Sequence, residues 1–105
     1  MNKNSINEVW QRVLDHSVEP GVKPNENQIF YTTARNIKFW IENHGNHILP
    51  KNENNSTLFP ITREILNNDL EMGVGSNTQI RVKDLGTPAP SYRYALLNDP
   101  RILIK

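Results

Sequence analysis

The chain has 105 residues, enough for one hydrophobic core, so we expect a single domain over residues 1–105. With 36% hydrophobic residues, 22% charged residues and a net charge of +1, it is too close to neutral for a polycationic nucleic-acid tail. The absence of cysteine excludes disulfides and thiolate chemistry, and no apolar run approaches the roughly 20 residues of a membrane span. Because Met1 to Asn4 also lack the apolar run of a secretory signal, we expect a cytoplasmic location without membrane association.

The first predicted element is an amphipathic helix over residues 7–16. Its apolar residues recur at helical spacing and form one stripe: Ile6, Val9, Trp10, Val13 and Leu14. Ser5 and Glu8 have the spacing of a capping box, in which each side chain accepts a hydrogen bond from a backbone amide at the helix start. We therefore expect Trp10 in the core, so that Trp10→Ala would cost about 3–5 kcal/mol.

Twofold periodicity then predicts three strands rich in aromatic and β-branched side chains. The segments are residues 28–33, 36–42 and 46–50. The turn sequence His44-Gly45-Asn46 separates the last two, and together the segments predict an antiparallel meander. Alternation places Trp40 on the opposite face from Phe39 and Ile41, so we expect Trp40 to be partly exposed or to lie at a partner interface.

A second helix is predicted between Thr62, a good N-cap, and Gly73, a typical stop. Ile61 and Leu66 have the spacing of a hydrophobic staple around its first turn. Its apolar side is formed by Ile65, Leu66, Leu70 and Met72. A short strand over residues 79–82 would follow.

The C-terminal part predicts one more short helix, over residues 92–98, capped by Ser91 and ended by Pro100. The closing apolar run, residues 102–104, is interpreted as either a terminal strand or an anchor on the core. The order of elements predicts an α+β fold, namely a small antiparallel three-stranded meander with helices packed on one face.

Signals for catalysis and for metal binding are weak. His44 and His47 have His-x-x-His spacing but flank a turn, and no third ligand lies at a recognisable spacing from them. The candidate carboxylates lack the strand-borne arrangement of a two-metal nuclease: Asp69, Glu71, Asp84 and Asp99. Neither a Gly-x-Ser-x-Gly turn nor a phosphate-binding loop is present. We therefore expect no metal and no cofactor, and we favour a non-catalytic role.

The charge distribution is more suggestive. Residues 78–105 hold five basic side chains, Arg81, Lys83, Arg93, Arg101 and Lys105, against the two acidic side chains of Asp84 and Asp99. Tyr92 lies within this segment, and basic residues interleaved with aromatics bind phosphates and stack on bases. The candidate nucleic-acid residues are Arg81, Lys83, Tyr92, Arg93 and Arg101. Arg93, in the first turn of the last helix, is the leading candidate, because helix amides there already favour an anion.

Two structural alternatives compete with this interpretation. The basic segment can be a solvated face with its tyrosines half in the core, and Arg101 can pair with Asp99 and serve the fold alone. The Pro90-Ser91-Tyr92 motif likewise has an architectural reading, in which proline starts the helix and serine caps it.

The C-terminal motifs also resemble a recurring ending of small uncharacterised prokaryotic domains. The matching segments are Pro90-Ser91-Tyr92, Tyr94-Ala95-Leu96-Leu97 and Asp99-Pro100-Arg101-Ile102, and the likeness extends over roughly residues 28–102. The resemblance implies a restriction or mobile-element context and does not indicate an activity. Such domains often have glycine before Pro-Ser-Tyr, where this chain has Ala89.

Two functions follow as expectations. The first is a non-catalytic nucleic-acid-associated module in a restriction or mobile-element setting. The alternative is a protein-binding accessory or inhibitor protein of phage or mobile-element origin, with Trp40 as the contact. The salt dependence of binding distinguishes the two functions. Phosphate contacts release counterions, so nucleic-acid binding weakens steeply as salt rises.

Overall fold

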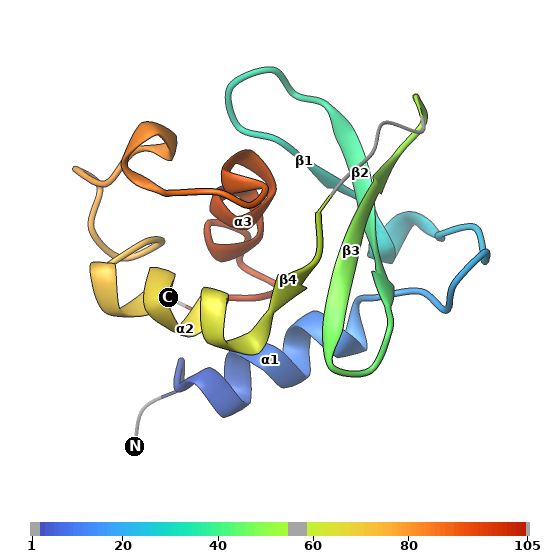
Figure 1. Cartoon of the computed structure of the whole chain (residues 1–105), viewed down its shortest axis with the longest axis horizontal. Helices are drawn as coiled ribbons and strands as arrows, with labels where there is room; N and C mark the ends of the chain where they lie inside the picture. Colours follow the sequence, from blue (N-terminus) through green and yellow to red (C-terminus); the bar gives the residue numbers. More distant parts are fainter. Residues whose placement is uncertain (1–2, 55–58, 105) are drawn as a thin grey trace.

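The computed structural model describes residues 3–54 and 59–104, which form an α+β fold (Figure 1). Its elements are α1 (Ile6–Asp15), η1 (Glu26–Gln28), β1 (Phe30–Tyr31), β2 (Lys38–Asn43), β3 (His47–Asn52), β4 (Ile61–Thr62), α2 (Arg63–Met72), η2 (Val82–Asp84) and α3 (Pro90–Leu97). None of the helices in these residues has the length and apolar character needed to cross a membrane.

The sheet is antiparallel in the order β1-β2-β3-β4, so the predicted meander is confirmed and gains a fourth strand. The added strand is short, and it forms because Ile61 pairs with Ile48 in the core. The predicted hairpin turn joins β2 to β3, with Gly45 at a φ of 89°. β1 is shorter than expected because residues 26–28 form a 3-10 turn, in which the Gln28 side chain accepts from the Asn25 amide.

Helix α1 confirms the predicted amphipathic stripe but corrects the place of Trp10. The Ser5 hydroxyl accepts a hydrogen bond from the Glu8 amide, as expected for the N-cap. Val9 and Val13 are completely buried, whereas Trp10 is only partly buried against the core. Trp10 follows Val9 by one residue and therefore lies about 100° around the helix, at the edge of the buried face.

Helix α2 confirms its predicted limits. The Thr62 hydroxyl accepts from the Ile65 amide, and Gly73 ends the helix in the left-handed conformation with a φ of 101°. Leu66 is completely buried. Met72 is 44% exposed, so the expectation that it belongs to the apolar side of the helix is wrong. The predicted strand over residues 79–82 is wrong, since a turn and η2 occupy this part of the chain.

Helix α3 begins at Pro90, so the predicted Ser91 cap is also wrong. Ala89 is the N-cap residue, in left-handed conformation with a φ of 52°, and Ser91 is the exposed second residue of the helix. Proline suits the first helical position because its φ is already helical and its missing N–H is not needed there. After α3, Ile102 and Leu103 are buried without forming a strand, and thus act as an anchor.

The core lies between one face of the sheet and the three helices, which Figure 1 shows on the same side of the sheet. Phe30 and Phe39 stack at a ring distance of 5.6 Å on neighbouring strands. The Tyr92 ring of α3 meets Phe39 edge-on at 4.8 Å. The opposite face of the sheet is covered in part by the segment around η1, where the Gly21 amide donates to Glu42 and Pro24 and Ile29 lie beside Trp40.

Candidate functional site

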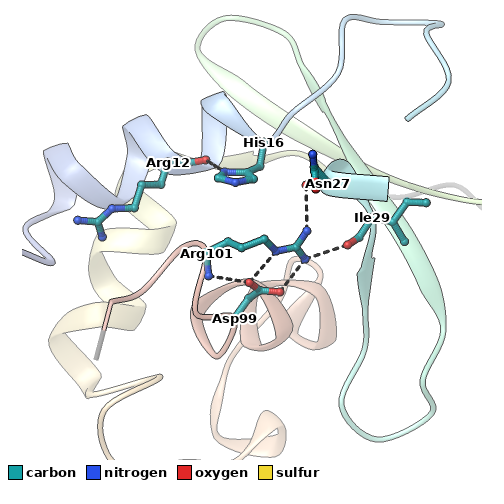
Figure 2. Close-up of polar contacts among 6 residues, drawn as sticks. All are labelled: Arg12, His16, Asn27, Ile29, Asp99 and Arg101. Carbon is teal, nitrogen blue, oxygen red and sulfur yellow. Dashed lines mark hydrogen bonds and ion pairs between the residues drawn. The ribbon is translucent and has the colours of Figure 1, made fainter. Parts of the chain in front are cut away.

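Arg101, one of the predicted nucleic-acid residues, fastens the C-terminal turn to the segment that leads into β1 (Figure 2). Its Nε and Nη2 donate to the two carboxylate oxygens of Asp99 at 2.9 and 2.8 Å. Its Nη1 donates to the Asn27 carbonyl at 2.9 Å, and Nη2 also donates to the Ile29 carbonyl at 2.8 Å. The guanidinium lies 4.1 Å from the centre of the Phe30 ring. These contacts support the alternative in which Arg101 pairs with Asp99 and stabilises the fold.

Electrostatics strengthens this arrangement. Burial alone would raise the pKa of the Asp99 carboxyl, but hydrogen bonds from the side chain and backbone of Arg101 outweigh it and hold the pKa below its ordinary value. The hydrogen bond to Asp99 in turn raises the pKa of Arg101. His16, whose Nδ1 is 2.8 Å from the Arg12 carbonyl oxygen, adds a weaker stabilisation of the Asp99 charge (Figure 2).

Arg93, the leading sequence candidate, lies in the interior with 3% of its surface exposed. Its Nη1 and Nη2 donate to the carbonyls of Pro88 and Gly86 at 2.9 and 2.8 Å. Its Nε lies 3.0 Å from Oδ2 of the buried Asp69 on α2, a charge contact in which neither atom has hydrogen-bond geometry with any described partner. The expectation that Arg93 faces a bound phosphate is therefore corrected, because its guanidinium is buried between α2 and α3 and pairs with Asp69.

Tyr92 lies between the core and the surface. Its hydroxyl accepts a hydrogen bond from Asn52 Nδ2 at 3.1 Å, and its ring packs on Phe39. It also lines an open groove of about 290 Å³ between the β1–β2 loop and the start of α3. The groove is lined by Thr32, Thr33, Ala34, Arg35, Ile37, Val82, Ser91 and Tyr92.

Val82 lines this groove, and its chain neighbours Arg81 and Lys83 are exposed but do not belong to the lining. Arg35 lines the opposite wall and is exposed as well. None of these three cations forms an ion pair with another residue in the described parts of the chain. Asp84 offsets one charge, and its carboxylate accepts from the Arg81 amide at 2.8 Å. Sequence reasoning missed Arg35, because only the fold brings the β1–β2 loop to η2.

Trp40 is partly exposed, as predicted from the alternation. Pro24 and Ile29 border it, and these residues form part of a second open groove of about 390 Å³. This groove is on the face of the sheet that faces away from the helices.

The two histidines of the hairpin stack on each other, with ring centres 5.1 Å apart. His44 Nε2 lies 3.0 Å from Glu42 Oε1. Within residues 3–54 and 59–104, no group of three or more histidine or carboxylate side chains is arranged to hold a metal ion. Comparisons with family models, curated proteins and solved structures find no match for this chain.

Proposed function

We propose that the protein is a non-catalytic nucleic-acid-associated module. The observation that carries the proposal is the groove beside Tyr92, lined by Arg35 and by Val82, with the exposed Arg81 and Lys83 next to Val82 in the chain. Cations that have no carboxylate partner are available to phosphates, and their counterions are released when a phosphate binds. A cytoplasmic, prokaryotic setting near restriction or mobile-element genes, suggested by the C-terminal motifs, belongs to the same proposal.

The groove supplies neutral contacts beside the charges. Hydroxyl groups of Thr33 and Ser91 lie in its lining and can hydrogen-bond to phosphate or sugar oxygens. The Thr32 hydroxyl already accepts from the Ile37 amide at 2.9 Å, which holds the shape of the β1–β2 loop. With three cations and one nearby carboxylate the local charge is modest, so the proposal concerns moderate, salt-sensitive binding.

The alternative, a protein-binding accessory or inhibitor protein, is favoured by one observation. Trp40, Pro24 and Ile29 line an open groove on the outer side of the sheet, and aromatic side chains are common anchors of protein interfaces. Binding of this kind depends on apolar contact and changes little with salt.

An electrophoretic mobility shift with duplex and single-stranded oligonucleotides across a salt series tests the proposal. We expect binding at about 50 mM salt that weakens steeply as salt rises. The double variant Arg81→Ala, Lys83→Ala should weaken it and reduce the salt slope by about two. The matched control, Lys3→Ala with Arg63→Ala, removes the same charge from exposed residues outside the groove and should keep the slope.

Absence of any oligonucleotide binding by the wild type at about 50 mM salt would remove the nucleic-acid proposal, because non-specific contacts are strongest at low salt. The protein-binding alternative would then lead.

A further inference from the structure

Two aromatic side chains and two lysines alternate on the face of the sheet opposite α1, α2 and α3. Tyr31 of β1 is directly opposite Lys38 of β2, and Trp40 of β2 is directly opposite Lys51 of β3. Directly opposed residues of antiparallel strands project to the same side, as do residues two apart along one strand. Tyr31, Lys38, Trp40 and Lys51 therefore share one surface, which we call the outer face. Tyr31 is 52% exposed there.

We propose that the outer face binds single-stranded nucleic acid, with Tyr31 and Trp40 as stacking surfaces for two bases and the lysines as phosphate contacts. This inference rests on the proposed function and names the form of nucleic acid that the sheet takes. Every base has a face that stacks on an aromatic ring, and sheets that expose aromatics bind single strands in this manner. A duplex keeps its bases stacked on one another and cannot offer those faces.

The spacing of the two rings suits successive nucleotides. Tyr31 and Trp40 occupy diagonal positions on neighbouring strands, and such positions are roughly 7–8 Å apart. An extended single strand can place consecutive unstacked bases over such a distance. The groove of about 390 Å³ beside Trp40, lined also by Lys23, Pro24 and Ile29, provides the space for a base against the indole.

On this side of the sheet three lysines, Lys23, Lys38 and Lys51, outnumber the carboxylates of Glu42 and Glu53, which favours a polyanion. Lys38 pairs with Glu53 at 3.0 Å, but their side chains are 41% and 65% exposed, and such pairs contribute little. A phosphate can therefore replace Glu53 as the partner of Lys38. Lys51 is 4.0 Å from Glu42, whose other carboxylate oxygen accepts from the Gly21 amide. Lys23 has no ion pair among the described residues, which leaves it available to phosphate.

These features favour nucleic acid over a protein as the occupant of the outer face. Pro24 and Ile29 supply apolar area on one side of Trp40, but the positions directly opposite Tyr31 and Trp40 are both lysines, which suit phosphates better than an apolar protein contact. Alternating aromatic and basic side chains match the alternating bases and phosphates of a single strand.

The test uses the full chain with Trp10→Phe, so that Trp40 is the only tryptophan. Its fluorescence is followed during titration with oligothymidylate, oligouridylate and a duplex, each of about 10 nucleotides, at about 50 mM salt. Tyr31→Ala removes one stacking surface, and Tyr31→Phe is the matched control that keeps it. Glu53→Gln removes the carboxylate that competes with phosphate for Lys38.

We expect single strands to quench Trp40 and the duplex to leave it unchanged. Tyr31→Ala should weaken binding roughly five- to 150-fold, the range for loss of one base–aromatic stack, and Tyr31→Phe should bind like its parent. Glu53→Gln should bind more tightly. Because Tyr31 is already half exposed, its truncation leaves the core intact, and an unchanged unfolding transition checks this.

Two results would overturn the inference, and only the first of them retains the proposed function. Oligonucleotide binding that ignores Tyr31→Ala and disappears in the Arg81→Ala, Lys83→Ala variant refutes the outer face and retains the proposed function. No binding of any oligonucleotide refutes both.

Discussion

Asp69 of α2 and Arg93 of α3 form an ion pair in the interior, with Arg93 Nε 3.0 Å from Asp69 Oδ2 and both side chains at most 5% exposed. The same guanidinium binds the carbonyls of Gly86 and Pro88, so one side chain joins α2, α3 and the loop between them. Desolvation of two charges is costly, and the pair is tolerated because each charge compensates the other.

Removal of one member of this pair should therefore destabilise the domain strongly. We expect Arg93→Met to lower the free energy of unfolding by about 3–5 kcal/mol, because it leaves the Asp69 carboxylate buried without its counter-charge. The double variant Asp69→Leu, Arg93→Met should recover much of the loss, since no unpaired charge remains. Urea denaturation of the four proteins in the cycle measures the coupling, and strictly additive losses would show that the pair does not interact.

Asp69 also predicts an unusual pH dependence. Desolvation by burial outweighs the attraction of Arg93 and raises the pKa of the Asp69 carboxyl from its ordinary 3.8 to about 6. The folded state then binds more protons than the unfolded state between these values, so this contribution to stability is complete below about pH 4 and is lost as pH rises through about 6.

We expect the stability of the wild type relative to Asp69→Asn to fall by on the order of 2–3 kcal/mol between about pH 4 and pH 7. Glu42 and Asp99 act in another window. Hydrogen bonds outweigh desolvation at both and lower their pKa values, so their contributions are lost as pH falls below 4.5 and 3.8. Denaturation curves across pH separate the windows, and a constant difference between wild type and Asp69→Asn would contradict the Asp69 prediction.

The hydrogen bonds of Arg101 require its planar guanidinium group. Arg101→Lys keeps the charge but cannot reach Asp99 and the Asn27 and Ile29 carbonyls together, so we expect a loss of about 1–3 kcal/mol. Thermal unfolding should show this as a fall in Tm of roughly 4–8 °C per kcal/mol for a domain of this size. The exposed control Lys83→Arg should have an unchanged Tm, and an equally unchanged Arg101→Lys would mean that these hydrogen bonds add nothing to stability.

Ala89 carries backbone strain that glycine would relieve. It has a φ of 52°, a region that costs a residue with a Cβ roughly 1–2 kcal/mol, partly offset by the greater freedom of glycine in the unfolded chain. We expect Ala89→Gly to stabilise the protein by about 0.5–1 kcal/mol. Ala95→Gly, inside α3, should do the opposite, and a less stable Ala89→Gly protein would disprove the strain.

Local sequence signals determined much of this fold. Ser5, Thr62 and Gly73 set helix ends through hydrogen bonds or backbone conformations that involve only near neighbours in the chain. The turn at His44-Gly45-Asn46 and the alternation around Trp40 are equally local, and both are confirmed. Such features depend on residues that are close together in the sequence.

Tertiary structure alone decided which charged and aromatic side chains are available at the surface. Arg93 has the sequence signature of an exposed residue at a helix start, and it is buried because α2 places Asp69 against it. Arg35 lies near Val82, the chain neighbour of Arg81, only because the fold brings two loops that are distant in sequence to the same groove. Tyr31 shares a face with Trp40 because the strand register pairs it with Lys38. These outcomes depend on contacts between segments far apart in the chain, which a pattern of near neighbours does not contain.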